Sequence, residues 1–243
     1  MLQIRDVSRK FATKFGVRNA TLTIEPGRTY ALLGPNGSGK TTLMKMIAGL
    51  MTPTSGEILF EGKRIGPKTK AHIAFMPTES YFYPYMTIRD AGKYYRDFFE
   101  DFDMARYEET LQRMDLNPKD RIDKLSSGMN AKVRLALTLS RNAELMMFDE
   151  PLNGVDILTR TQVINEIVRY RNEGRSMIIS THLVEEMDDY IDHVVFMKNG
   201  TVVKECSRAE LAAEKSLIDL YLELYASPAA ASAAPVQGVI TGA

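Results

Sequence analysis

The sequence predicts an α/β fold: a mainly parallel sheet flanked by helices, with an antiparallel β subdomain at its amino-terminal end and an inserted helical subdomain. Three observations predict it. Short apolar strands alternate with helical patterns, a glycine-rich loop joins one strand to one helix, and an aromatic helical stretch interrupts the alternation. The 243 residues, 44% of them hydrophobic, suffice for one compact domain. We expect that domain over 1–226, with the helical subdomain at about 80–140 and a disordered tail at 227–243.

The amino-terminal part reads as a series of short strands. Alternating or continuous apolar residues predict strands at 2–7, 21–24, 29–33, 56–60 and 73–76. A Glu-Pro-Gly turn separates the second strand from the third. Strands this close together, with turns between them, favour antiparallel pairing in this part of the chain.

An aromatic segment at 81–85 opens the helical stretch. Thr87 can cap the first helix because Asp90 follows three residues later, the spacing of a capping box. The apolar residues at helical spacing, which we assign to the core, are Ala91, Tyr95, Phe98 and Phe102. A second helix is predicted at about 107–114, before an Asn-Pro pair.

Strands and helices alternate again in the last part of the chain, which favours a parallel sheet. The pattern predicts a strand at 145–148, a helix at 157–171, a strand at 176–180 and a helix at 183–190. Asn199-Gly200 then predicts a hairpin of strands 193–198 and 201–204. Ser207 and Glu210 form a capping box, and a terminal helix carries an apolar stripe of Leu217, Leu220, Tyr221 and Leu224.

The run at 34–42 fits the phosphate-loop pattern G-x-x-x-x-G-K-[ST] and lies between a predicted strand and a predicted helix. Its glycines permit backbone angles that turn successive N–H groups toward phosphate oxygens. Lys40 is expected to bind the β- and γ-phosphates, and Thr41 to offer a hydroxyl to Mg²⁺. The residues assigned to the nucleotide are Gly34, Asn36, Gly37, Ser38, Gly39, Lys40, Thr41 and Thr42. The alternative is a turn that only joins strand to helix.

Two carboxylates, Asp149 and Glu150, end the apolar run at 145–148. Ligands gather at the carboxyl ends of parallel strands, so these side chains are expected beside the phosphate loop. Asp149 would help to hold Mg²⁺, and Glu150 would polarise a water for attack on the γ-phosphate. An ordinary acidic loop is the competing interpretation.

Ser126 and Gly128 precede a helical pattern at 130–141. The amino terminus of a helix can bind an anion, so the serine hydroxyl could contact a phosphate. The residues alone favour a plain helix cap, because serine is common at this position.

The order of these motifs resembles that of the ATP-binding subunit of an ABC transporter. The four elements are the phosphate loop, 125–129, 149–151 and Ser180-Thr181-His182, and the resemblance covers about residues 1–205. It implies a P-loop NTPase fold of ABC type that hydrolyses ATP with Mg²⁺. It also implies a head-to-tail dimer with a second ATPase subunit, identical or different, which sandwiches two ATP molecules.

The same resemblance assigns residues that the pattern alone could not. It implies that Phe11 stacks on adenine, and that Ser126 and Gly128 contact the nucleotide of the opposite subunit. Asp156 would communicate across the dimer, and His182 would reach the γ-phosphate and the attacking water. Without the resemblance, His182 reads as a surface residue at a helix start.

Two positions differ from the family pattern. Ser127 and Met129 replace the third and fifth residues of Leu-Ser-Gly-Gly-Gln. Thr78 and Glu79 stand where the family has a glutamine that senses Mg²⁺ and the membrane partner. Thr78 is too short to replace that amide, so we expect Glu79 or water to act toward Mg²⁺, because carboxylates ligate this ion.

Composition limits location and partners. A formal net charge of zero gives no basic surface for nucleic acid, which we do not expect as a partner. The chain has a single cysteine, no leader pattern and no run of about 20 apolar residues. We therefore expect a cytoplasmic protein, peripheral on the inner face of the cell membrane through a transmembrane permease subunit. Its short length favours a small exporter.

Alternatives remain at this stage. The aromatic segment 81–85 could receive the permease or fill the core beneath the helical insertion. The chain could instead be a non-transport ABC switch acting on a soluble or nucleic-acid partner. It could also be a subunit that binds ATP structurally while its partner hydrolyses it.

Overall fold

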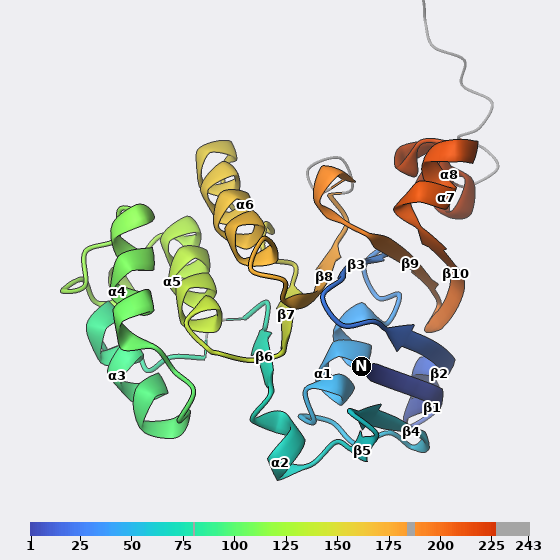
Figure 1. Cartoon of the computed structure of the whole chain (residues 1–243), viewed down its shortest axis with the longest axis horizontal. Coiled ribbons are helices and arrows are strands. Elements are labelled where there is room, and N and C mark those ends of the chain that lie inside the picture. The colour runs from blue at the N-terminus through green and yellow to red at the C-terminus, as the bar shows by residue number, and fades with distance from the viewer. Residues whose placement is uncertain (80, 184–187, 227–243) are drawn as a thin grey trace, which may run out of the picture.

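The computed structural model describes residues 1–79, 81–183 and 188–226 and shows two sheets with helices between and beside them (Figure 1). Helix α1 (Lys40–Ile47) lies between the sheets, and its buried residues share one core with both of them. The other face of the larger sheet is covered by helices that form a second core with it. The predicted fold class is confirmed.

The smaller sheet is antiparallel, with strand order β2-β1-β4-β5. Its strands are β1 (Leu2–Phe11), β2 (Lys14–Ile24), β4 (Ser55–Phe60) and β5 (Lys63–Arg64). β1 and β2 are longer than the predicted 2–7 and 21–24, and a turn containing Ala12, at a φ of 46°, joins them. Register shifts along the pair interrupt the two-residue alternation, which explains why the sequence pattern missed half of this hairpin.

The larger sheet has the order β10-β9-β3-β8-β7-β6, and only β9 and β10 are antiparallel. Its strands are β3 (Thr29–Leu33), β6 (Ile73–Met76), β7 (Leu145–Asp149), β8 (Ser176–Thr181), β9 (His193–Lys198) and β10 (Thr201–Ser207). Leu33 pairs with Thr181, and Asp149 pairs with Ser180. The segments that leave these strands therefore emerge at one edge of the sheet, the usual place for a ligand.

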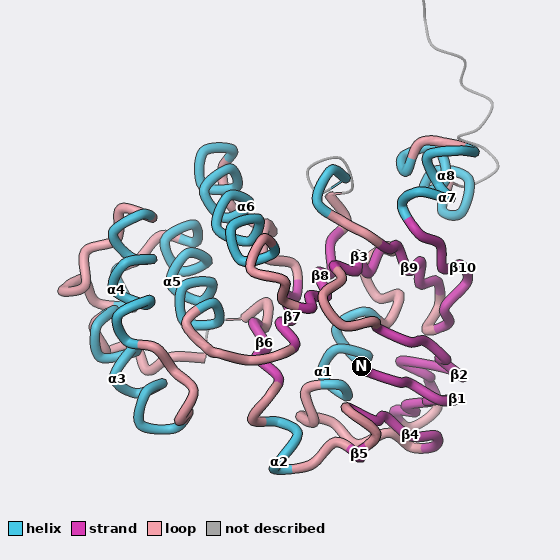
Figure 2. Tube along the Cα trace, viewed as in Figure 1, coloured by secondary structure: helices cyan, strands magenta, loops and turns pink. Residues whose placement is uncertain are grey.

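Helices α3 (Ile88–Phe98), α4 (Met104–Arg113) and α5 (Ser127–Leu139) contact one another at the end of the molecule away from the smaller sheet (Figure 2). Helix α6 (Ile157–Arg171) packs against α5. The remaining helices are α2 (Pro67–Lys70), α7 (Arg208–Glu214) and α8 (Leu217–Tyr225), with short 3-10 helices at Ile122–Lys124 and Asp188–Tyr190.

Several predicted details are wrong. Phe98 is 67% exposed rather than part of the core, and α3 ends there, so the buried Phe102 lies beyond the helix. Helix α5 begins at Ser127 rather than at 130 because the Ser126 hydroxyl accepts from the N–H of Met129. Of the predicted helix 183–190, residues 184–187 lie outside the described residues, and 188–190 form a 3-10 turn. Ser80 and the tail 227–243 also lie outside them.

Helix α8 connects the end of the described chain to the phosphate loop. The Tyr225 hydroxyl donates to the carbonyls of Met197, at 2.9 Å, and Leu33, at 3.3 Å. Burial raises the pKa of Tyr225, so the phenol stays protonated and remains a donor. Leu33 directly precedes Gly34, and α8 thereby fastens the strand from which the loop departs.

Candidate functional site

The phosphate loop joins β3 to α1 in a conformation that requires glycine. Gly39 caps α1 at a φ of 108°, and Gly34 has a φ of 154°. A Cβ at Gly34 would lie 2.3 Å from the Met197 carbonyl oxygen. The Lys40 side chain is only 5% exposed, and its Nζ donates to Gly34 O at 2.7 Å. The loop thus holds a lysine at the amino terminus of a helix, where an anion is stabilised.

Asp149 ends β7 and is fully buried. Its carboxylate accepts three hydroxyl hydrogen bonds, from Thr41 at 3.1 Å, Thr78 at 3.0 Å and Ser180 at 2.7 Å. Ser180 was not predicted as a site residue, although a serine ending an otherwise apolar strand was a signal. The three hydroxyls fix the carboxylate beside the phosphate loop.

Glu150 adopts a left-handed conformation, with a φ of 50°, and is 8% exposed. Its N–H donates to the Ser180 hydroxyl at 2.9 Å. One carboxylate oxygen lies 3.2 Å from Lys40 Nζ, and the other lies 2.8 Å from His182 Nδ1. The structure therefore brings Lys40, at the start of α1, and His182, just after β8, into contact with Glu150, just after β7.

A cleft of about 360 Å³ opens over these groups. It is lined by Phe11, Lys14, Phe15, Gly16, Asn36, Gly37, Ser38, Gly39, Lys40, Thr41, Thr42, Thr78, Glu150 and Asn153. Phe11 is 42% exposed, and a Cβ at Gly16 would lie 2.7 Å from its ring. Lys14, Phe15, Gly16 and Asn153 were not predicted as site residues. An aromatic wall at one end and the phosphate loop at the other suit a nucleotide base and its phosphates.

Ser126, Gly128 and Asp156 do not line this cleft. Ser126 is exposed and caps α5, and Asp156 caps α6 by accepting from the Thr159 N–H at 3.0 Å. A Cβ at Gly128 would lie 3.1 Å from the Thr159 hydroxyl, so the two helix starts adjoin. We call Ser126, Ser127, Gly128 and Asp156 the signature surface. Ser127 Oγ connects its two parts by donating to Gly154 O at 3.0 Å.

The residues around Asp149 fit a divalent cation that is also bound by phosphates. Within the described ranges, no three His, Cys, Asp or Glu side chains cluster closely enough to hold a metal alone. Thr41 and Asp149 do supply two oxygens 3.1 Å apart, and oxygen is the ligand that Mg²⁺ prefers. Thr78 faces Asp149, whereas the predicted Glu79 is exposed and is not a lining residue.

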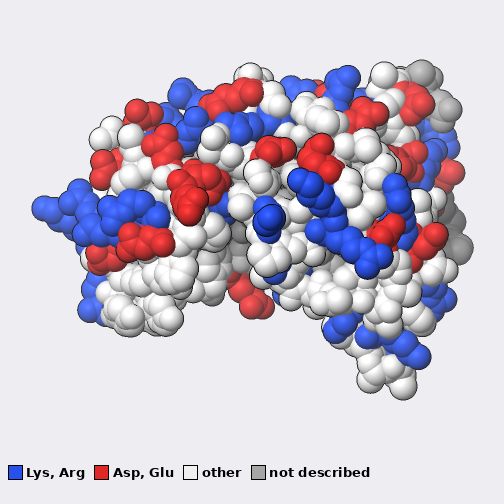
Figure 3. Space-filling model, turned by 60° about the horizontal axis from the view of Figure 1, so that its bottom comes forward, with Lys and Arg blue, Asp and Glu red and all other residues white. Residues whose placement is uncertain are grey.

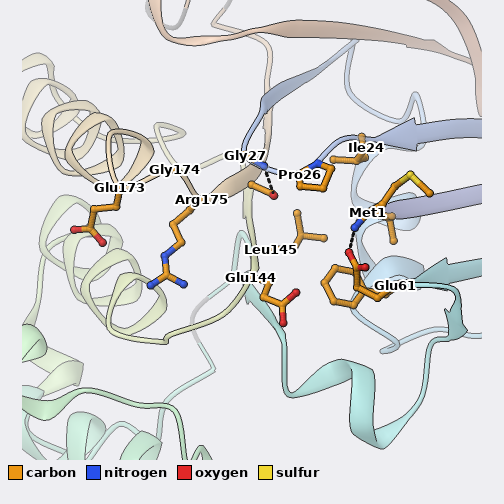
Figure 4. A pocket seen from close by; sticks show the side chains of 13 residues that line it. Met1, Ile24, Pro26, Gly27, Glu61, Glu144, Leu145, Glu173, Gly174 and Arg175 are labelled. Atoms are coloured by element: carbon orange, nitrogen blue, oxygen red, sulfur yellow. Dashed lines mark hydrogen bonds and ion pairs between the residues drawn. The ribbon is translucent and has the colours of Figure 1, made fainter.

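A second cleft, of about 350 Å³, lies at the opposite ends of the parallel strands (Figure 4). Leu145 and Ser176, which line it, begin β7 and β8. Three glutamates also line it: Glu61, Glu144 and Glu173. The amino ends of the strands and an acidic lining are both unfavourable for a triphosphate, so the cleft beside Lys40 is the candidate site.

The glycine loop runs from β3 to the start of α1, and it faces two neighbouring carboxylates at the end of β7, two places away in the sheet. This arrangement defines the P-loop nucleotide-binding class. The chain belongs to the ABC transporter family, whose sequence model matches residues 17–153. It is an ATPase cassette of that family and an ATP-binding subunit.

Curated relatives cover most of the chain. YtrB of Bacillus subtilis, an ABC transporter ATP-binding protein, is 29% identical over 217 residues, which are 88% of this chain and 74% of YtrB. LnrL of the same species, a linearmycin resistance ATP-binding protein, is 29% identical over 220 residues, 87% of this chain and 70% of LnrL. SrtF of Streptococcus pyogenes, a lantibiotic transport ATP-binding protein, is 28% identical over 207 residues, 84% of this chain and 90% of SrtF.

Solved structures share the fold. The ATP-binding subunit of an ABC transporter superposes with a TM-score of 0.82 at 27% identity, over 92% of this chain and 99% of that one. CbiO1 of Clostridium perfringens, part of the transporter complex CbiONQ, gives 0.72 at 26% identity, over 93% and 95%. In the part of this chain that the structure describes, no helix combines the length and apolar character needed to cross a membrane.

Proposed function

We propose that this chain hydrolyses Mg²⁺-ATP as one subunit of a dimeric ATPase that drives a separate transmembrane permease, in the direction of export. The contact of Lys40 and His182 with opposite oxygens of the Glu150 carboxylate carries the proposal. It joins a buried phosphate-binding cation and a buried carboxylate base to an imidazole that is 38% exposed and can orient the carboxylate from the open side.

Glu150 accepts the proton of the attacking water, and His182 keeps the carboxylate directed toward it. Lys40 exchanges its carbonyl contact with Gly34 for the phosphate oxygens. Bound Mg²⁺ supplies charge that offsets the developing negative charge on those oxygens. Thr41 and Asp149 are the residues proposed to hold the ion, with Thr78 and Glu79 beside them; an unchanged rate in Glu79→Ala would count against Glu79.

The signature surface is the basis for proposing a dimer. Neither Ser126, which is exposed, nor the buried Gly128 lines the cleft of its own chain, so a nucleotide would meet them if a second subunit presented one. In a head-to-tail dimer, each signature surface would close the opposite cleft, with Phe11 against the adenine. ATP binding would close the dimer and hydrolysis would reopen it, and this cycle would move the permease.

Exposed aromatic side chains favour a docking role for the helical end. Tyr83 and Tyr85 are exposed and stacked with ring centroids 5.5 Å apart. Tyr94 contacts the rings of both Tyr83 and Phe98, so the exposed Phe98 lies close to this pair. Tyr81 is also exposed over part of its side chain, but its hydroxyl contacts that of the buried Tyr95, so the aromatic segment contributes to both the core and the surface. An uncharged area also lies at the end of the molecule that carries α3 and α4 (Figure 3). Such surfaces are typical of protein interfaces.

The names of two relatives support export as the direction of transport. LnrL is named for linearmycin resistance and SrtF for lantibiotic transport, which suit the removal of a compound from the cell. YclP of Bacillus subtilis is named for petrobactin import, so family membership alone does not set the direction.

The test is the rate of Mg²⁺-dependent ATP hydrolysis per subunit against chain concentration, with Glu150→Gln as the control. We expect the specific rate to rise steeply with concentration, because each site needs two chains. Glu150→Gln should lower it by about 10²–10⁴-fold, the usual contribution of general base catalysis. A rate that is independent of concentration, or unchanged in the variant, would refute the proposal.

A further inference from the structure

Arg134 is a buried cation in the middle of α5. It is 7% exposed, and within the described ranges no carboxylate forms an ion pair with it. Its Nη1 donates to the carbonyl of Pro77 at 2.5 Å and to the carbonyl of Thr78. Its Nε is buried without a hydrogen-bond partner. Burial lowers the pKa of Arg134, as expected for a cation removed from water.

A buried charge is costly unless its donors are satisfied. The two carbonyls are the compensation that the structure provides, so α5 and the segment at 77–78 cannot separate without exposing the charge or leaving it unpaired. Hydrogen bonds to charged groups are about twice as strong as neutral ones. Arg134 therefore makes a tight connection between two segments that are 56 residues apart in sequence.

The two ends of this connection belong to different parts of the proposed mechanism. On one side, the Thr78 hydroxyl donates to Asp149 Oδ2, in the cleft of the same chain. On the other side, Ser126 caps the helix that contains Arg134. Eight residues separate Arg134 from Ser126, about 12 Å along an α-helix, which moves as one rigid element.

We infer that Arg134 is a positioning residue that couples nucleotide in its own cleft to the placement of Ser126 and Gly128 toward the opposite cleft. When Asp149 rearranges to face Mg²⁺-ATP, Thr78, which is hydrogen-bonded to it, shifts. Arg134 moves with the carbonyls of 77–78, and α5 moves the signature surface with Arg134. The inference rests on the proposed dimeric ATPase. It predicts that one chain's nucleotide prepares the surface that completes its neighbour's site.

Arg134→Met tests this coupling, because Met keeps the unbranched stem as far as the Nε position and removes the charge and the donors beyond it. Lys132→Met is the matched control: it lies on the same helix, but Lys132 Nζ donates to Met114 O at 3.1 Å, away from the cleft. Hydrogen exchange is measured on peptides covering 76–79 and 125–131, with and without Mg²⁺-ATP. The chain concentration is kept low enough that sedimentation shows a monomer.

In wild type and Lys132→Met, ATP should change exchange in both peptides. In Arg134→Met the change at 76–79 should persist, and the change at 125–131 should fall at least fivefold, the lower end of typical coupling between sites. At higher concentration, the Hill coefficient for ATP hydrolysis should fall from near 2 toward 1. A purely structural arginine would instead lower the thermal midpoint and leave the ATP-induced change at 125–131 intact, which would overturn the inference.

Two further observations keep the outcomes separate. If Arg134→Met does not fold, Arg134→Gln keeps a polar side chain but removes the charge and ends two bonds short of the Nη1 that reaches both carbonyls. An exchange response at 125–131 equal to wild type would then refute the coupling. If wild type neither dimerises nor hydrolyses ATP, the proposed function fails, while the exchange measurement on the monomer still decides the role of Arg134.

Discussion

The cleft and the signature surface differ in how the chain holds them. In the cleft, buried side chains from three strand ends and one helix bind one another directly, as Asp149 does with Thr41 and Ser180. On the signature surface, Ser126 and Asp156 are exposed and bond mainly to the first turns of their own helices. One chain therefore organises the groups that act on its own phosphates, but only presents the groups that would act on the phosphates of a second chain.

The largest effect is expected when the cleft is damaged on one chain and the signature surface on another. Lys40→Met damages the cleft, and Gly128→Val damages the signature surface, because a side chain there meets Thr159. Each variant alone should lose about 10²-fold or more in ATP hydrolysis, the usual effect of removing one stabilising donor. An equimolar mixture should regain activity, since a mixed head-to-tail dimer has one site with neither substitution. The measurement is the hydrolysis rate of each variant and of the mixture.

The mixture of Lys40→Met with Glu150→Gln is the control, because both changes damage the cleft. In its mixed dimer each site carries one damaged cleft, so no activity should return. Recovery in this control, or none in the first mixture, would contradict the division of labour between the two surfaces.

The next effect concerns the backbone of the cleft. Gly34→Ala should destabilise the chain by about 1–3 kcal/mol, because it adds strain at positive φ and a contact of 2.3 Å with the Met197 carbonyl. Thermal unfolding should show a lower midpoint, by roughly 2–4 °C for each kcal/mol. Gly37→Ala is the control: its φ is 79°, but its Cβ would meet nothing within 4 Å. Equal losses in the two variants would show that the close packing at Gly34 does not matter.

A smaller effect is expected within the signature surface. Ser127→Ala removes the hydrogen bond to Gly154 O, worth about 0.5–1.5 kcal/mol at most. We expect a fall of severalfold in the rate per dimer and little change in nucleotide binding by the monomer. Titration with a fluorescent ATP analogue checks the binding. A larger loss of nucleotide binding by the monomer than of turnover would show that Ser127 acts on the cleft of its own chain, contrary to this prediction.

The smallest effect is a pH dependence at Asp156. The Thr159 N–H, followed by its hydroxyl, lowers the pKa of this carboxyl below its ordinary value of about 3.8. A lowered pKa stabilises the fold above the ordinary value, and this contribution disappears as the pH falls through the folded pKa. The side-chain amide in Asp156→Asn would still cap the helix but would not titrate. The difference between the thermal midpoints of wild type and the variant should therefore shrink from about pH 5 downward. A difference that stays constant with pH would show that the Asp156 charge does not contribute to stability.

The sequence predicted the parts of the molecule that local pattern determines. The phosphate loop and β7 were recognisable because short continuous segments define them, and these segments fix the fold class. Contacts between distant segments were not predictable: Ser180 on β8 reaches its register partner Asp149 on the neighbouring β7, and Arg134 reaches the carbonyls of 77–78. Phe98 was placed in the core because it follows the helical spacing of Ala91 and Tyr95, which are buried, but it is the last residue of α3 and is exposed. Periodicity identifies a stripe, not the partner that covers it.

The hydrogen bonds of Tyr225 make the two ends of the described part of the chain unequal for protein engineering. A label inserted directly after α8 would adjoin a phenol that donates to the carbonyls of Leu33 and Met197, and Leu33 is one residue from the first glycine of the loop. The Met1 ammonium instead pairs with Glu61 beside the acidic cleft, at the far ends of the parallel strands. A reporter or affinity handle attached at Met1 is therefore farther from the phosphate loop than one inserted directly after Tyr225, and is the better choice for measuring nucleotide kinetics.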